Sequence, residues 1–394
     1  MLRVANGKWD AHLKDFLAAR AIVERPARNP HAKMPLVWTW TRCRASSRRC
    51  GPRTPRARAV EIDPVDESTV REQHGRMLQV AVAAAAFLAA GPLVAQMLPQ
   101  GPPAQRLVLR GFTAARYNAQ GLTAEGKLDF RLRLFRSEHL ALRENYAALG
   151  VVAGLSPAFA RGGLFVEVQP LSVLQLGAQL EAVRWFGTFD LVQSFSSARA
   201  AHWEADLQRL GDLPAGDPAR NYGASGTNLT LWGRLQVRFG PLAVRDTLSL
   251  FRPDLGLRAG DPVYYDGTHD FLLPNRGWLM TNDADVLWLR AGGVAGLVLG
   301  LRHTLVSAAY RSADFAAGES PVDINGPMHR LGPLAAYTLH ERGGGWFNAP
   351  TIAVLTQWYL KHRYRAGQER SAIIPSVALA FGFFGDLLPV TDPP

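Results

Sequence analysis

The sequence predicts an all-β fold, a single transmembrane antiparallel up-and-down β-barrel of about twelve strands. Apolar and polar residues alternate with a period of two through most of residues 96–394, as in strands with one apolar and one polar face. After Phe186 the linkers between these segments are alternately long and short. Long loops at one end and short turns at the other are typical of a barrel that crosses a membrane.

The charge is concentrated at the N-terminus. The chain has 394 residues and a net charge of +11, and residues 1–76 hold 16 Lys and Arg against 8 Asp and Glu. Seven arginines lie between Arg42 and Arg58, without an apolar period that could support a core. We expect residues 1–76 to be a disordered basic extension, or to precede the true start of the protein. Nucleic acid is not an expected partner, because the remaining 318 positions carry only a small surplus of positive charge.

Residues 77–95 read as a signal peptide. The run from Met77 is uncharged, breaks at Gly91-Pro92 and ends on Ala95, a small residue that suits cleavage. The alternative is an uncleaved membrane helix with an Arg-rich cytoplasmic tail. Cleavage would leave residues 96–394 as the mature barrel. Cys43 and Cys50 are the only cysteines, so that part of the chain has no disulfide framework.

Eleven segments are candidate strands. Residues 127–135 set the pattern: Leu128, Phe130, Leu132 and Leu134 share one face, and charged residues occupy the other. The candidates are residues 127–135, 145–155, 162–169, 173–186, 226–239, 242–251, 277–289, 294–310, 328–340, 349–364 and 371–385. Residues 197–210 read instead as a short amphipathic loop helix.

A twelfth strand follows from topology. Single-chain bacterial barrels have even strand numbers, and an odd count would leave the mature N-terminus on the wrong side of the membrane. Residues 105–114 are the available candidate, although their alternation is poor. We expect this strand to pair antiparallel with residues 371–385 and close the barrel, with residues 115–126 as the first outer loop.

Aromatic residues and strand length favour a membrane barrel over a secreted soluble β-domain. Trp278, Trp288, Tyr310 and Trp358 lie near strand ends, where interfacial girdles form. The last strand alternates Val377, Leu379, Phe381 and Phe383 on one face. The chain thus resembles bacterial outer-membrane β-barrel proteins of the porin-like kind, without the motif of a specific family. The resemblance implies a bacterial outer-membrane location, with membrane lipid and the barrel-assembly machinery as partners. The chain departs from the pattern in extending past its last aromatic residue.

The polar faces of these strands are expected to line the lumen, because Arg or Lys on the lipid face costs about 2–4 kcal/mol at mid-bilayer. The predicted lumen residues are Asp129, Arg131, Arg133, Glu167, Gln175, Gln179, Glu181, Arg234, Gln236 and Arg238. Arg245 and Asp246 cannot share this face, so one of them is expected at the membrane edge or in a bulge.

Catalysis is the least favoured function. The sequence contains no HExxH, GxSxG or GxxxxGK[ST] motif, and we expect no cofactor or metal. One polar cluster, Asp266, His269, Asp270, Asp283 and Asp285, invites comparison with barrel proteases of the omptin type. General-base catalysis needs a histidine within hydrogen-bond reach of a carboxylate, which sequence proximity does not establish.

The leading functional hypothesis is a small pore or passive transport protein for polar solutes. A mixed-sign lumen can line an aqueous pore, or it can pair its charges and close the barrel. The alternatives are therefore a closed structural or surface-interaction barrel and, less favoured, an outer-membrane hydrolase with its site in residues 252–285.

Overall fold

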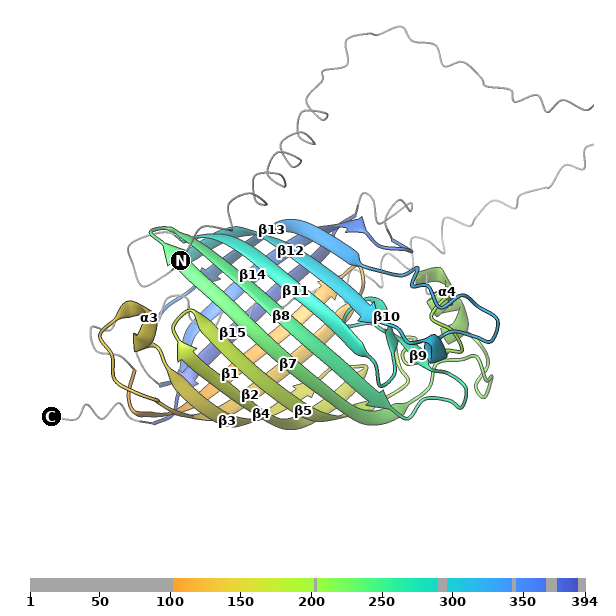
Figure 1. The fold of residues 1–394 in the computed structure, drawn as a ribbon, viewed down its shortest axis with the longest axis horizontal. Helices are drawn as coiled ribbons and strands as arrows, with labels where there is room; N and C mark the ends of the chain where they lie inside the picture. The colour runs from red at the N-terminus through yellow and green to blue at the C-terminus, as the bar shows by residue number, and fades with distance from the viewer. Residues whose placement is uncertain (1–101, 202–203, 290–295, 342–344, 366–373, 389–394) are drawn as a thin grey trace, which may run out of the picture. The chain divides into compact units, whose positions relative to one another are not determined.

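A computed structural model describes residues 102–201, 204–289, 296–341, 345–365 and 374–388 (Figure 1). The predicted extension 1–76 and signal peptide 77–95 lie outside the described residues. Within the described part, twelve strands form a closed antiparallel barrel in which each barrel strand pairs with the next one along the chain. These strands are β1 (Gln105–Tyr117), β2 (Gly121–Leu132), β3 (Tyr146–Leu155), β4 (Phe159–Leu171), β5 (Leu174–Trp185), β7 (Ala224–Phe239), β8 (Leu242–Leu255), β11 (Trp278–Leu289), β12 (Leu297–Ala309), β13 (Met328–Thr338), β14 (Gly345–Lys361) and β15 (Ser376–Asp386).

The closing pair confirms the strand that topology required. β1 is antiparallel to β15, with partners running from Val108 opposite Asp386 to Tyr117 opposite Val377. The predicted all-β barrel and its count of twelve strands are therefore confirmed.

The predicted first outer loop, residues 115–126, is wrong. β1 continues to Tyr117 and β2 begins at Gly121, so the connection is a three-residue turn. Asn118 has a φ of 54°, a left-handed conformation that asparagine tolerates better than most residues. The predicted strand began at residue 127 because the outward positions before it include Ala124 and Gly126, whose small side chains do not stand out as apolar in the alternation.

The two ends of the barrel differ. The β5–β7, β8–β11, β12–β13 and β14–β15 connections are long and lie at one end. The β4–β5 and β7–β8 connections lie at the other end and are turns of two residues, while the β2–β3 connection at that end, residues 133–145, is longer. In barrels of this kind the long loops are extracellular and the short turns periplasmic. By this rule β1 starts and β15 ends on the periplasmic side.

Three further strands lie within the extracellular loops. β6 (Gln193–Phe195), β9 (Val263–Asp266) and β10 (Phe271–Pro274) form a small antiparallel sheet in the order β10-β9-β6. The helices are short: α3 (Leu140–Arg143), α4 (Glu204–Gly211) and the 3-10 turn η1 (Ser312–Asp314). α4 overlaps residues 197–210, which the sequence predicted to form a short loop helix. In the described part of the chain, no helix is long and apolar enough to span a membrane.

The barrel is apolar outside and polar inside. Large apolar side chains on the outer wall are exposed, for example Leu149 at 62%, Leu164 at 60% and Leu301 at 54%. Charged side chains on the inner wall are buried, including Asp129 at 0% and Glu181 at 1% exposure. An apolar exterior on a closed sheet suits lipid, where every backbone polar group must be satisfied within the protein.

Candidate functional site: the polar lumen and its plug

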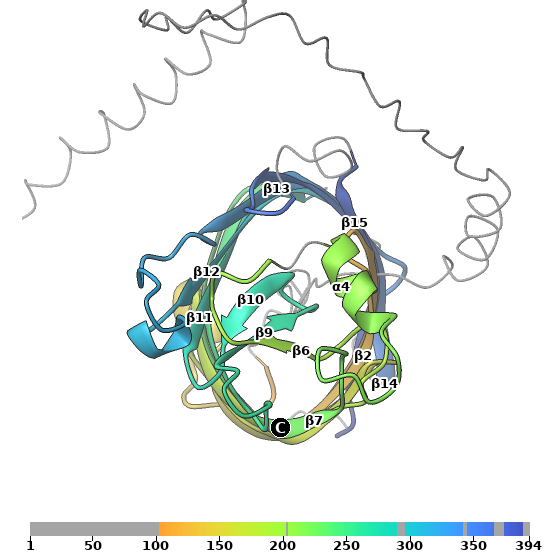
Figure 2. The same cartoon turned by 90° about the vertical axis from the view of Figure 1, so that its right-hand side faces the viewer.

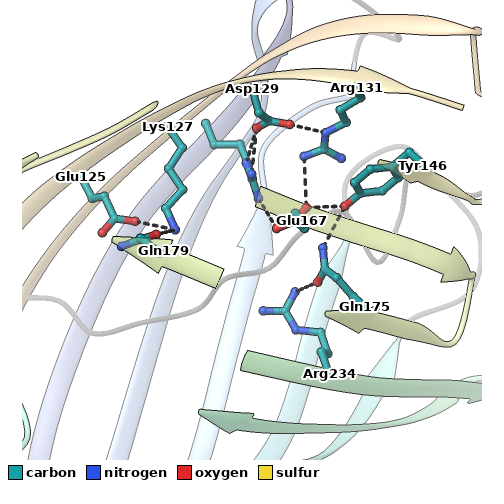
Figure 3. Close-up of polar contacts among 10 residues, drawn as sticks. Glu125, Lys127, Asp129, Arg131, Tyr146, Glu167, Gln175, Gln179 and Arg234 are labelled. Atoms are coloured by element: carbon teal, nitrogen blue, oxygen red, sulfur yellow. Dashed lines mark hydrogen bonds and ion pairs between the residues drawn. The ribbon is translucent and has the colours of Figure 1, made fainter. Parts of the chain in front are cut away.

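A network of ion pairs crosses the inner wall near the periplasmic end (Figure 3). The buried carboxylate of Asp129 on β2 accepts hydrogen bonds from Arg110 at 2.8 Å and from Arg131 at 2.5 Å. Both arginines also lie near Glu167 on β4, at 3.6 and 3.9 Å. Two carboxylates and two guanidinium groups thus neutralise one another on one side of the lumen, as buried charges require.

The network continues along neighbouring strands. Tyr146 donates a hydrogen bond to Glu167 and accepts one from the amide of Gln175 at 2.8 Å. Gln175 accepts in turn from Arg234 at 3.1 Å, and Arg234 also reaches Thr247 at 3.4 Å. Arg234 has no carboxylate partner among the described residues, since its contacts are with neutral groups.

A second group lies beside it on β2, β4 and β5. Lys127 donates to Gln179 at 2.8 Å and lies 3.5 Å from Glu125. Arg161 pairs with Glu125 at 2.5 Å and lies 3.5 Å from Glu181. Figure 3 shows Lys127 and Gln179 approaching each other from different strands.

The opposite wall carries a third group. Asp285 on β11 lies between two arginines, Arg245 at 2.6 Å and Arg302 at 2.7 Å. Asp283 accepts from Thr304 at 2.5 Å and lies 3.5 Å from Arg302. These residues come from three adjacent strands in register, with Arg245 opposite Asp285 and Asp285 opposite Arg302.

Three predicted lumen residues lie at the periplasmic rim. Arg133 follows the last residue of β2 and donates to the carbonyl of Pro102. Gln236 donates to the carbonyl of Ser172 in the β4–β5 turn. Arg238 is exposed and bonds to the carbonyl of Gly240 in the next turn. The other predicted residues are Asp129, Arg131, Glu167, Gln175, Gln179, Glu181 and Arg234, and the structure places all of them on the inner wall.

Sequence reasoning did not single out several members of these networks. Arg110, Lys127, Tyr146 and Arg302 share the inward phase of their strands, and that alternation is the signal that could have found them. The pairing of their charges depends on strand register, which the alternation alone does not give.

The small sheet fills the extracellular mouth. Seen from that end, β9 and β10 lie inside the ring of barrel strands (Figure 2). Tyr264, Phe271 and Leu273, all 1% exposed or less, belong to one apolar cluster with inward residues of the wall such as Trp185 and Phe251. We call residues 263–274 the plug, because they place a packed apolar layer across the mouth.

A polar latch fixes the plug to the wall. The carboxylate of Asp270 is 1% exposed and accepts hydrogen bonds from Tyr265 at 2.6 Å and Tyr359 at 2.7 Å. Arg365, just beyond β14, lies 2.6 Å from it. Burial alone would raise the pKa of Asp270, but the charge of Arg365 and the hydrogen bonds hold it below its usual range. Arg116 of β1 donates to two carbonyls of the plug loop.

The predicted polar cluster separates into two places. Asp266 and His269 face each other at 3.3 Å in the plug, beside the latch residue Asp270. Asp283 and Asp285 are bound to arginines on the inner wall of β11. Within the described residues no group of three or more His, Cys, Asp or Glu side chains is arranged to hold a metal. The five residues therefore do not form one site.

Comparisons with known proteins give distant likenesses. No protein-family model and no curated protein matches the sequence. Among solved structures, the translocator domain of the autotransporter NalP from Neisseria meningitidis is 12% identical, with a TM-score of 0.36, over 81% of this chain and 96% of that one. The β domain of the Bordetella autotransporter BrkA is 12% identical, with a TM-score of 0.38, over 72% of this chain and 100% of that one. The CymD monoaromatic hydrocarbon channel is 12% identical, with a TM-score of 0.33, over 79% of this chain and 96% of that one.

The architecture itself supplies the assignment. A closed antiparallel barrel with an apolar outer wall, a charged interior and its longest loops at one end has the features of a membrane-spanning barrel. The chain therefore has the fold of an outer-membrane β-barrel protein.

Proposed function

We propose that the barrel is a pore for small polar solutes that is closed at rest by its plug. The observation that carries the proposal is the position of the plug: an apolar layer lies over a lumen lined with charges, and a polar latch holds it. The latch consists of hydrogen bonds and an ion pair, which are reversible contacts.

The lumen favours anions in this proposal. Arg234 contacts only neutral groups, and Arg330 on β13 stacks over Tyr359 with its Nε unsatisfied. Neither has a carboxylate partner among the described residues, whereas the inner-wall carboxylates lie beside cations. An anionic solute would find two guanidinium groups that no carboxylate already occupies.

The test is planar-bilayer conductance of the refolded full chain. Asp270→Asn removes the charge that binds Arg365, so the plug is released more often and open events become more frequent than in the wild type. The reversal potential in a salt gradient should indicate anion preference. Asp254→Asn is the matched control, because Asp254 pairs with Arg276 at the exposed rim and its loss should leave the conductance unchanged.

A second candidate is a closed structural or surface-interaction barrel. The burial of the lumen charges favours it, since Asp129, Glu181 and Asp285 are each 1% exposed or less. This candidate predicts that Asp270→Asn stays electrically silent while the protein keeps the heat-modifiable gel mobility of a folded barrel. That result would contradict the pore.

A further inference from the structure

Three arginines gather around Tyr359 where the plug meets the barrel wall. Arg330 on β13 and Arg365 beyond β14 both lie over the Tyr359 ring, each with its guanidinium carbon 5.8 Å from the ring centre. Arg116 on β1 lies near enough for its charge to interact with those of Arg330 and Asp270. We call Arg116, Arg330 and Arg365 the arginine cluster.

The arginine cluster lies on the lumen side of the plug. Met328, the first residue of β13, is fully buried in the apolar cluster that contains Tyr264 and Phe271 of the plug. β13 follows the extracellular β12–β13 loop, so its next inward residue, Arg330, lies one step deeper along the same strand. A ligand of Arg330 would therefore lie directly beneath the apolar layer.

A single carboxylate accompanies these three cations. Asp270 lies 2.6 Å from Arg365 and accepts a hydrogen bond from Tyr359 at 2.7 Å. Neither Arg116 nor Arg330 has a carboxylate partner among the described residues. Two positive charges thus remain uncompensated beside the latch, and they repel each other. Buried charges are costly unless an opposite charge accompanies them, so this place favours an anion.

The two arginines also have hydrogen-bond donors to spare. Arg330 is only 8% exposed, and its Nε has no hydrogen-bond partner. A guanidinium group has five N–H donors. Arg116 donates three hydrogen bonds to carbonyl oxygens of the β1–β2 turn and of the plug loop, which leaves two donors. An anion could therefore bind both groups while Arg116 keeps its contacts with the plug.

We propose that Arg330 and Arg116 form a binding site for a small dianionic oxyanion of the phosphate or sulfate class. The planar fork of a guanidinium group matches two oxygens of such an anion, and two negative charges would balance the two uncompensated cations. The inference deepens the proposed function and rests on it for the passage of the anion through the barrel. Binding itself needs only the closed protein, because the latch between Asp270 and Arg365 stays intact.

Isothermal titration calorimetry of the refolded full chain with inorganic phosphate tests the site. Sodium chloride keeps the ionic strength constant, and the titration is done at about pH 8, where phosphate is mainly dianionic. The wild type should bind one phosphate saturably. Arg330→Gln should weaken binding by about a hundredfold, because two charge-assisted hydrogen bonds are lost.

Arg238→Gln is the matched control. Arg238 is exposed at the periplasmic rim, bonds to the carbonyl of Gly240 and likewise has no carboxylate partner among the described residues. Its replacement removes the same charge from the chain and should leave the phosphate affinity unchanged. An equal loss of affinity in Arg238→Gln and Arg330→Gln would mean that phosphate responds to net charge, which would overturn the site.

A conservative substitution separates binding from folding. Arg330→Lys keeps the charge but not the planar fork, so it should bind phosphate about tenfold more weakly than the wild type, the loss of one charge-assisted hydrogen bond. Gel mobility of unheated samples shows which variants are folded. Absence of saturable phosphate binding to the folded wild type, or wild-type affinity in folded Arg330→Lys, would overturn the proposal.

The site and the pore fail in different ways. Phosphate binding that depends on Arg330, in a protein that stays electrically silent as Asp270→Asn, would support the site and contradict the pore. Conductance of Asp270→Asn without phosphate binding to the wild type would support the pore and contradict the site.

Discussion

His362 is held as a neutral imidazole by two backbone groups. Its Nε2 lies 3.0 Å from the carbonyl oxygen of Asp270, to which it donates, and its Nδ1 accepts from the N–H of Tyr364 at 3.1 Å. Protonation at Nδ1 would break the second bond. Burial lowers the pKa of His362, against the opposing influence of Asp270.

We expect this histidine to make the attachment of the plug weaker in acid. The released form takes up a proton at the ordinary histidine pKa of about 6.5, whereas the latched form resists protonation, so attachment weakens as the pH falls below that value. Asp270 adds a similar loss only below about pH 4, because its pKa is depressed from the ordinary aspartate value. Limited proteolysis of the plug loop should therefore be faster at pH 5 than at pH 7.5.

His362→Gln is the control for this prediction. A glutamine amide can donate to the carbonyl of Asp270 but does not titrate, so cleavage of this variant should be nearly independent of pH over the same range. The same acid acceleration in His362→Gln would assign the effect to another group.

Residues differ in how far the sequence predicts them. Alternation was sufficient to place Asp129 and Glu167 on the polar face. It could not predict that Arg110 bridges them, because that contact joins β1, β2 and β4 through register. The polar residues of a predicted loop placed Asp270 in a candidate cluster, but its partners Tyr359 and Arg365 are 89 and 95 residues away along the chain.

At the scale of elements, the barrel strands and the plug strands gave different signals. A barrel strand faces lipid on one side and the lumen on the other, which produces the period of two. β9 and β10 have four residues each and are buried throughout, so they show no alternation. The plug was therefore assigned to loops. β1 shows poor alternation, so it was predicted only from the even strand number that a closed barrel requires.

The β1–β15 seam can be tested directly. Thr113 and Phe381 are direct partners across it, and antiparallel partners have Cα separations of about 4.5–5.5 Å, within the range of a disulfide. With Cys43 and Cys50 replaced by Ser, the pair Thr113→Cys and Phe381→Cys should form an intramolecular disulfide in the folded protein.

The control pair combines Thr113→Cys with Ala153→Cys on β3, two strands away from β1. It should stay reduced, and mass spectrometry after digestion distinguishes the two outcomes. A free thiol at both positions of the seam pair would mean that β1 does not close the barrel there.

At the scale of the whole molecule, the barrel reverses the arrangement of a soluble protein. Its outer wall is apolar, and its interior holds arginines and carboxylates in paired groups. Breaking a buried pair by removing one partner costs about 3–5 kcal/mol, because the remaining charge is left buried without a partner. The plug adds an apolar layer only at the extracellular mouth.

The most direct measurement is the single-channel conductance of a barrel without its plug. Residues 258–275 are replaced by a short Gly-Ser linker that joins β8 to β11, which removes β9 and β10 and leaves all twelve barrel strands. We predict a steady, anion-preferring conductance where the wild type is mostly closed. A shortened protein that folds, inserts and remains electrically silent would contradict the account, because the paired charges of the lumen would then close the barrel by themselves.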